Sequence, residues 1–459
     1  MRKSTKKLLG LTAFAAISLS MLAGCTNNTS GKTKITFWHT MGTNLQAVLD
    51  RIISDFNEIY PDITIEHSSQ GGYDDLEGKI NDAIPAGTTP TIAYCYPDHV
   101  AEYLESNAVI SVSDFVNDPE LGFSADDGLV DDFITAYWQE GQEYKTEGIY
   151  SVPFAKSTEV MFYNKTIFDD AAHHASGQVY QVPTTWESMD TLMAQMKVDY
   201  PTIIPLGYDS DANFFITLCE QYGIPYTSLN TETGKGSADF NNDAAKAMVS
   251  KMVDWYNAGY LLTQGVNGNA YTSTAFTDGT LAMTIGSTGG TSYNYTANFS
   301  VGTAQVPQPD ATSPFSFGGS LEKTDHIIMQ GPSVCFFRKG TQAQKEAAWK
   351  FYKFAVKALN SATFSVASGY SPVRESSFTC SAMTDYLNSA QTGSAALIQT
   401  TVNLYQNLTS RYYVSPAFHG SSTCRNQVNG IFANVALGTK TLNDAFAYAY
   451  AKSVFAIGD

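Results

Sequence analysis

The sequence predicts an α/β protein of at least two domains, in which helices cover parallel sheets. The chain has 459 residues, more than one hydrophobic core usually holds, so two or more domains are expected. Residues 33–96 alternate strand-like and amphipathic helical runs in the order β-α-β-α-β, which is typical of a parallel sheet covered by helices. Hydrophobic residues make up 43% of the chain, as expected of a globular protein.

The first 25 residues have the pattern of a secretory signal peptide. A basic start with Arg2 and Lys3 precedes an apolar stretch, Leu8–Leu22, and small residues before Cys25. The ending Leu-Ala-Gly-Cys resembles the bacterial lipobox, in which the cysteine is lipidated; an ordinary signal peptide with an incidental cysteine is the alternative. We therefore expect cleavage after residue 24, acylation of Cys25 and a flexible tether over residues 25–34. This places the protein on the extracytoplasmic face of the cell membrane, held by lipid alone.

The element order continues along the chain. The first part reads as strand, helix, strand, helix and strand over residues 33–39, 44–61, 62–69, 73–84 and 91–96. A strand, a crossing and a second strand follow near residues 148–164, and a capping box of Thr184 and Glu187 predicts a helix start. Later segments read as helix, strand, strand-plus-helix and helix over residues 243–259, 276–290, 333–357 and 439–455.

Charge and cysteine content narrow the function classes. The formal net charge is −17, which disfavours nucleic acid and anionic membrane surfaces as partners. The cysteines other than Cys25 show no close spacing, so neither a zinc site nor a disulfide framework is indicated. Asp209, Asp211, Asn213 and Glu220 fall at EF-hand positions, but Phe214 stands where the loop demands glycine, and a helix start with acidic caps explains them better. We expect no metal and no cofactor.

The stretch "PFAKSTEVMFYNKTIFDD", Pro153–Asp170, carries a family resemblance. It resembles the signature of family 1 extracellular solute-binding proteins, the receptors of carbohydrate-uptake ABC importers. The resemblance implies a two-lobed, periplasmic-binding-protein-like fold of type II, with a hinge of several crossings near Pro153, Gly331 and Gly369 and a ligand cleft between the lobes. It implies one lobe from residues 35–153 and 330–368, and the other from 154–329 and 369–459.

Further motifs are similar to ligand-contacting positions of the glycerophosphate-binding branch of this family. The turn "GGYDD", the crossing serine, "AMTIGS", "MQGPSVCFF", "SGYSPV" and "SSTCRNQV" nominate, in that order, Tyr73, Ser157, Ser287, Gly331, Tyr370 and Arg425. A glutamate contact of that branch falls on Pro97, with Asp98 beside it. Two tryptophans that sandwich the ligand in that branch have no counterpart in this sequence. Residues 311–326 form an insertion relative to that branch.

Two more residues complete the candidate site, and each candidate has a structural alternative. Phe214 is the nearest aromatic to the missing tryptophans, although the core suits it better, and His39 at a strand end is as much a core as a cleft residue. Tyr73 could be surface packing, and Arg425 could simply pair with one of many acids. A glycerophosphate would use Arg425 and the serines, whereas a sugar would use Tyr73, Tyr370, Phe214 and Asp98.

The resemblance implies a monomeric binding protein that closes around a small carbohydrate or glycerophosphate and hands it to ABC permease subunits. No nucleophile, base or metal is needed, so no catalytic residue is expected. The alternatives are a secreted glycoside hydrolase, which needs two carboxylates flanking a cleft, and a surface adhesin lipoprotein, which predicts no ligand-dependent closure.

Overall fold

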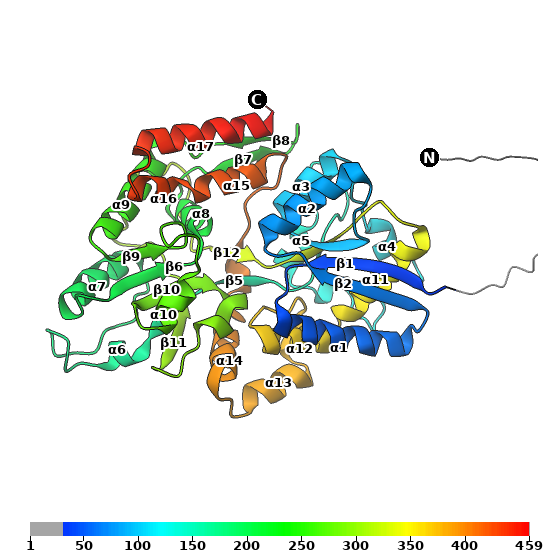
Figure 1. The fold of residues 1–459 in the computed structure, drawn as a ribbon, viewed down its shortest axis with the longest axis horizontal. Coiled ribbons are helices and arrows are strands. Elements are labelled where there is room, and N and C mark those ends of the chain that lie inside the picture. The colour runs from blue at the N-terminus through cyan, green and yellow to red at the C-terminus, as the bar shows by residue number, and fades with distance from the viewer. Residues whose placement is uncertain (1–30, 459) are drawn as a thin grey trace, which may run out of the picture.

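The computed structural model describes residues 31–458 and contains two α/β lobes that face each other (Figure 1). The signal peptide, Cys25 and most of the tether lie outside the described residues. We call the part around the five-stranded sheet lobe 1 and the part around the seven-stranded sheet lobe 2. Among the described helices, none combines the length and apolar character needed to cross a membrane.

Lobe 1 is built on the sheet order β2-β1-β3-β13-β4. β1 pairs parallel to both β2 and β3, which confirms the β-α-β-α-β order expected for residues 33–96. β13 then inserts antiparallel between β3 and β4. The strands are β1 Thr33–His39, β2 Ile63–Ser69, β3 Ile92–Cys95, β4 Val152–Pro153 and β13 Ser333–Phe336. The helices are α1 Thr43–Ile59, α2 Tyr73–Ala86, α3 Pro97–Glu105, α4 Ser113–Asn117, η1 Val130–Asp132, α5 Thr135–Glu140, α11 Gln342–Ala355 and α12 Ala358–Ser368.

Lobe 2 is built on the order β14-β12-β5-β10-β6-β9, with β11 also on β5. Its strands are β5 Ser157–Asn164, β6 Ile204–Tyr208, β9 Leu261–Thr263, β10 Leu281–Ser287, β11 Val301–Gln305, β12 Ile327–Gln330 and β14 Tyr412–Tyr413, and β7 Thr227–Asn230 with β8 Lys235–Ala238 makes a separate pair. Its helices are α6 Lys165–Asp169, α7 Trp186–Asp199, α8 Asp211–Tyr222, α9 Asp243–Asn257, α10 Thr272–Thr277, η2 Thr288–Asn294, η3 Glu375–Phe378, α13 Ser381–Asn388, α14 Gly393–Tyr405, η4 Thr409–Arg411, α15 Ser421–Asn429, α16 Ile431–Ala436 and α17 Leu442–Ile457.

The predicted capping box of α7 is wrong by one residue. Thr185 caps the helix and accepts a hydrogen bond from the Ser188 amide at 3.1 Å. The Glu187 carboxylate instead accepts the backbone amides of Asp310 and Phe315 at 2.8 and 2.6 Å. Glu187 therefore anchors the insertion against lobe 2, a long-range role that a local cap pattern does not reveal.

The chain passes between the lobes where β4 leads to β5 and where β12 leads to β13. At the first passage Lys156 is fully buried and pairs with Glu140 at 2.5 Å, and its ammonium also donates to the Gly331 carbonyl at 2.9 Å. The second passage is Gly331 and Pro332, between strands of different sheets. After α12, Val373 still packs in the lobe 1 core, so the third passage follows it.

Gly331→Ala is expected to destabilise the protein by at least about 1–2 kcal/mol, the cost of a left-handed backbone for a residue with a Cβ. Gly331 has φ +85°, and a Cβ there would lie 2.4 Å from the Ala155 carbonyl oxygen. Urea unfolding measures the change. Gly318→Ala is the control, because Gly318 also has positive φ, +82°, but has open space around its Cβ position. Equal losses in both variants would show that the close approach at Gly331 carries no cost.

Candidate functional site

A pocket lies at the junction of the two lobes. Its empty space measures about 540 Å³, part of which is open to solvent. Lobe 1 contributes the start of α3 and the end of α5, and lobe 2 contributes β7, β12, the segment after β14, and α15. The lining residues are Tyr96, Pro97, Asp98, Glu140, Tyr226, Thr227, Ile328, Met329, Gln330, Val414, Ser415, Pro416, Ser421 and Arg425. Clefts between domains are preferred places for small ligands.

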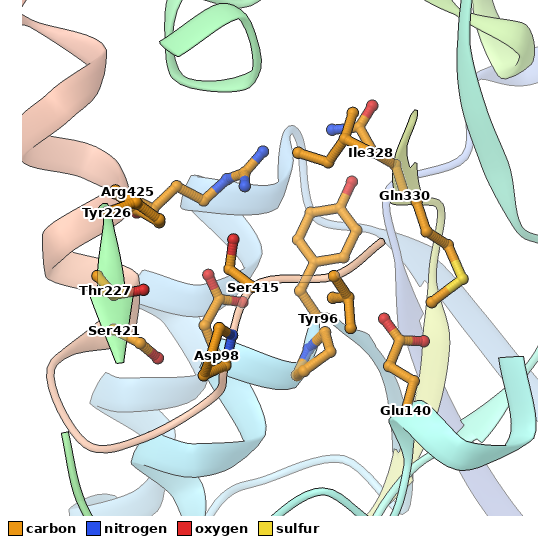
Figure 2. Close-up of a pocket in the computed structure, with 14 residues that line it drawn as sticks. Tyr96, Asp98, Glu140, Tyr226, Thr227, Ile328, Gln330, Ser415, Ser421 and Arg425 are labelled. Atoms are coloured by element: carbon orange, nitrogen blue, oxygen red, sulfur yellow. The ribbon is translucent and has the colours of Figure 1, made fainter. Parts of the chain in front are cut away.

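Arg425 and Tyr96 reach into this pocket from opposite lobes (Figure 2). Arg425 lies on α15, and the half-buried Tyr96 follows β3 as the N-cap of α3. Within residues 31–458, no carboxylate lies within ion-pair distance of the Arg425 guanidinium. Arg425 therefore forms no direct ion pair with these acids, and such a guanidinium suits a ligand anion.

A buried network holds Arg425 in place from behind. Its guanidinium donates to the side-chain oxygen of Asn213. The Asn213 amide nitrogen donates to Glu159 at 2.8 Å, and the Tyr208 hydroxyl donates to the other Glu159 oxygen. Burial raises the pKa of Glu159 to about 7, while Tyr208, Asn213 and Arg425 oppose the rise.

Tyrosines of both lobes adjoin the pocket. The Tyr73 ring stacks on Tyr96 with centroids 4.3 Å apart, and burial raises the pKa of Tyr73, with Tyr96 and Tyr370 adding to the rise. Tyr370 lies close over Gly289 of lobe 2, where a Cβ would come within 2.5 Å of its ring. Tyr73 and Tyr370 thus lie beside the pocket wall that Tyr96 forms.

The two candidate serines lie together at the hinge side of lobe 2. The Ser287 hydroxyl donates to Ser157 at 3.1 Å and accepts the Gly289 amide at 3.1 Å. Ser157 is almost fully buried. Gly331 is packed against the backbone of Ala155 and Lys156. Ser157, Ser287 and Gly331 therefore adjoin the crossings, whereas Asp98 and Arg425 line the pocket itself.

Two candidates are core residues. Phe214 is fully buried and stacks on Tyr208 with centroids 4.2 Å apart, so it offers no face to a ligand. His39 is also fully buried, and it hydrogen-bonds His67 at 2.8 Å and the Met41 amide at 3.1 Å. Burial and His67 lower the pKa of His39 to about 4. Phe214 and His39 therefore pack in the cores of their lobes and do not contact a ligand in this structure.

Sequence reasoning missed Tyr96, Asn213 and Glu159. Tyr96 is one residue before Pro97, where the expected glutamate contact falls, and an aromatic preceding a helix start was the available signal. Glu159 lies inside the signature stretch itself. Its partner Asn213 is 54 residues away, so no local pattern pairs them.

The lobes also touch beside the pocket. Glu102 of α3 accepts the backbone amide of Gly420, the N-cap of α15, at 2.6 Å, and bonds His419 at 2.9 Å. A lobe 1 carboxylate thus satisfies a free amide at the start of the helix that carries Arg425. This contact stabilises the arrangement in which both lobes line the pocket.

Glu102→Ala is expected to weaken solute affinity by roughly fivefold, about 1 kcal/mol for the lost hydrogen bond, without touching the ligand. Calorimetric titration of the parent and the variant, with a solute that the parent binds, measures the difference in affinity. Glu105→Ala is the matched control, because Glu105 is an exposed acid on the same helix. If the Glu102 variant binds as the parent does, this contact plays no part in closure.

Comparison with known proteins identifies the family. The sequence profile of the bacterial extracellular solute-binding protein family matches residues 51–390. The chain belongs to this family. The family expected from the stretch Pro153–Asp170 is confirmed. Membership of this family establishes that the chain is a solute-binding protein.

The relatives of this solute-binding protein include proteins named for different solutes. The sn-glycerol-3-phosphate-binding periplasmic protein of Escherichia coli K12 is 25% identical over 372 residues, 80% of each chain. The structure of UgpB from Mycobacterium tuberculosis, in complex with glycerophosphocholine, has a TM-score of 0.72 at 19% identity, covering 93% of this chain and 99% of that one. The GacH receptor of Streptomyces glaucescens, solved with acarbose, has a TM-score of 0.71 at 17% identity and the same coverage. These structures confirm the two-lobed α/β fold.

Proposed function

We propose that this chain is the substrate-binding lipoprotein of an ABC importer for a small carbohydrate-type solute bearing a phosphate ester, such as a glycerophosphate. The protein binds the solute between its lobes and delivers it to membrane permease subunits. It acts as a monomer, anchored through acylated Cys25 on the extracytoplasmic face. The relatives that bind glycerol phosphate and glycerophosphocholine support this ligand class.

The observation that carries the proposal is the unpaired Arg425 in a pocket shared by both lobes. A ligand that contacts Arg425 and Tyr96 together bridges the two lobes. Its binding energy then favours the closed state, because the open state offers one lobe at a time. The proposed site consists of Tyr96, Asp98 and Arg425, which Asn213 supports from behind, with Tyr73, Tyr370, Ser157, Ser287 and Gly331 adjoining it.

A neutral sugar is the second candidate, favoured by the stacked Tyr73–Tyr96 pair. Flat aromatic faces bind the C–H faces of sugars, and Asp98 could accept their hydroxyl groups. An acarbose-bound relative of the same fold agrees with this candidate.

A thermal-shift panel of glycerophosphates, polyols and oligosaccharides tests both candidates. Binding at one hundred times the dissociation constant adds about 2.7 kcal/mol of stability and raises Tm. A rise with glycerophosphates supports the proposal, and a rise with neutral sugars alone supports the second candidate. No shift with any solute contradicts a binding function of this kind.

The proposal includes no catalysis. Of the two carboxylates that line the pocket, Asp98 and Glu140, Glu140 is held in an ion pair with Lys156. Incubation with the bound oligosaccharide or glycerophosphodiester, followed by chromatography, should return the solute unchanged. Appearance of a hydrolysis product would overturn this part of the proposal.

A further inference from the structure

Glu159 is a buried acid behind the pocket, and neither packing nor solvent contact explains its presence. It lies on β5, and 1% of its surface is exposed. Both of its oxygens accept hydrogen bonds from side chains, one from the Tyr208 hydroxyl and the other from the amide of Asn213. Burying a carboxylate is costly, so such a group is usually retained for a role in its site.

The bond to Glu159 fixes which end of the Asn213 amide faces Arg425. Because the amide nitrogen donates to Glu159, the amide oxygen points the other way and accepts from Arg425. The backbone of Asn213 is fixed as well, since its amide donates to Ser210, the N-cap of α8, at 3.2 Å. A continuous chain of contacts therefore joins β5, α8 and α15, and ends at the pocket cation.

We propose that Glu159 is a positioning residue that acts through Asn213 on Arg425, and that capture of a phosphate-bearing solute is coupled to uptake of a proton by Glu159. This inference rests on the proposed function. A solute anion at Arg425 brings a negative charge toward the Glu159 carboxylate, which makes the protonated form of Glu159 more favourable in the complex.

The charged and titratable groups around Glu159 set the direction of the effect. Arg425 of α15 favours the carboxylate, whereas Asp209, at the end of β6, opposes it; Tyr208 donates a hydrogen bond to it. With a pKa of about 7 in the free protein, Glu159 is partly charged at neutral pH. A bound anion raises this pKa further, so the complex holds more protons than the free protein. Affinity is then highest below pH 7 and falls as pH rises through the two pKa values.

The test uses sn-glycero-3-phosphocholine as the probe, because its phosphodiester keeps one charge over the range measured. Calorimetric titrations of the full mature chain run from pH 6 to pH 9. We expect the parent to lose affinity on the order of tenfold across this range, the factor that corresponds to one unit of pKa change on binding. Glu159→Gln, which keeps hydrogen-bonding ends but cannot titrate, should bind with nearly constant affinity, close to the low-pH value of the parent.

Asp211→Asn is the matched control. Asp211 is a buried acid on the same helix as Asn213, but its carboxylate bonds Thr263 and the Gly265 amide. This variant should keep the pH dependence of the parent. Titrations of the parent at pH 7.5 in buffers of different ionisation enthalpy give an independent readout, since proton uptake on binding changes the observed heat. This readout needs no variant, so it stands even if Glu159→Gln folds poorly.

The outcomes separate the two claims. Binding by the parent with no pH dependence and no proton uptake overturns the role of Glu159 and leaves the proposed function standing. Equal pH dependence in the parent and Glu159→Gln also overturns it. Absence of probe binding at every pH overturns the phosphate-bearing ligand class and the coupling with it.

Discussion

Arg425→Ala is expected to weaken affinity for the captured solute by about 2 kcal/mol or more, roughly thirtyfold, as charge-assisted hydrogen bonds to a ligand contribute on this scale. Arg425 extends from α15 into the pocket opposite Tyr96 (Figure 2), so the variant loses the cation without cutting a protein ion pair. The affinity of Arg425→Lys should lie between those of the parent and Arg425→Ala, because lysine keeps the positive charge but lacks the planar guanidinium. Calorimetry or thermal shift measures the loss.

The matched control is Arg411→Ala. Arg411 is also a lobe 2 arginine, but its guanidinium bonds Gln305 and the Asp325 carbonyl, and it does not line the pocket. It should bind solute as the parent does. Equal affinity of the Arg425 variant and the parent would remove Arg425 from the site, and with it the main support for a phosphate-bearing ligand.

Lys156→Met is expected to lower the free energy of unfolding by about 3–5 kcal/mol, the usual cost of leaving one buried charge unpaired. The variant would leave the buried Glu140 with a single weak contact, from Ser333 at 3.4 Å, and would free the Gly331 carbonyl at the second crossing. Urea unfolding of the parent and variant measures the difference.

The loss should shrink at acidic pH. Burial raises the pKa of Glu140 even with Lys156 beside it, and removal of the lysine raises it further. A folded-state pKa above that of the unfolded chain favours folding at low pH, and this advantage is lost as pH rises. The variant should therefore approach the parent as the pH falls toward the pKa of Glu140.

Two controls define the origin of the effect. Lys165→Met breaks an exposed pair with Asp169, also 2.5 Å long, and should leave the stability close to that of the parent, because surface ion pairs contribute little. The double variant Lys156→Met with Glu140→Leu should recover part of the loss, since an apolar pair can replace a buried ion pair. A Lys156 variant as stable as the parent would show that the crossing does not depend on this pair.

Much of the fold was predictable because local patterns specify it. The strand over residues 33–39 and the helices near residues 44–61 and 243–259 follow apolar periodicities that nearby residues alone decide. The prediction of a capping box between Thr184 and Glu187 was wrong because the Glu187 carboxylate bonds distant residues of the insertion. A cap pattern describes one turn of helix, whereas these partners depend on the folded lobe.

The site was predictable where a single side chain carries a motif, as for Arg425 and Asp98, which line the pocket. It was not predictable where function depends on contacts between elements. Glu159 and Asn213 meet because β5 and α8 pack together, and Phe214 turns inward because the next residue on that helix, after Asn213, faces Tyr208. Adjacent positions of α8 thus hold a network residue, Asn213, and a core residue, Phe214.

The insertion of β13 between β3 and β4 governs how this polypeptide can acquire its structure. β4 ends at Pro153, yet its pairing partner begins at Ser333. The sheet of lobe 1 cannot complete its backbone hydrogen bonds until β13, which lies in the last third of the chain, has been synthesised. Strand pairings between residues so far apart in the sequence form slowly. A chain truncated before Ser333 therefore leaves two unpaired strand edges exposed to aggregation.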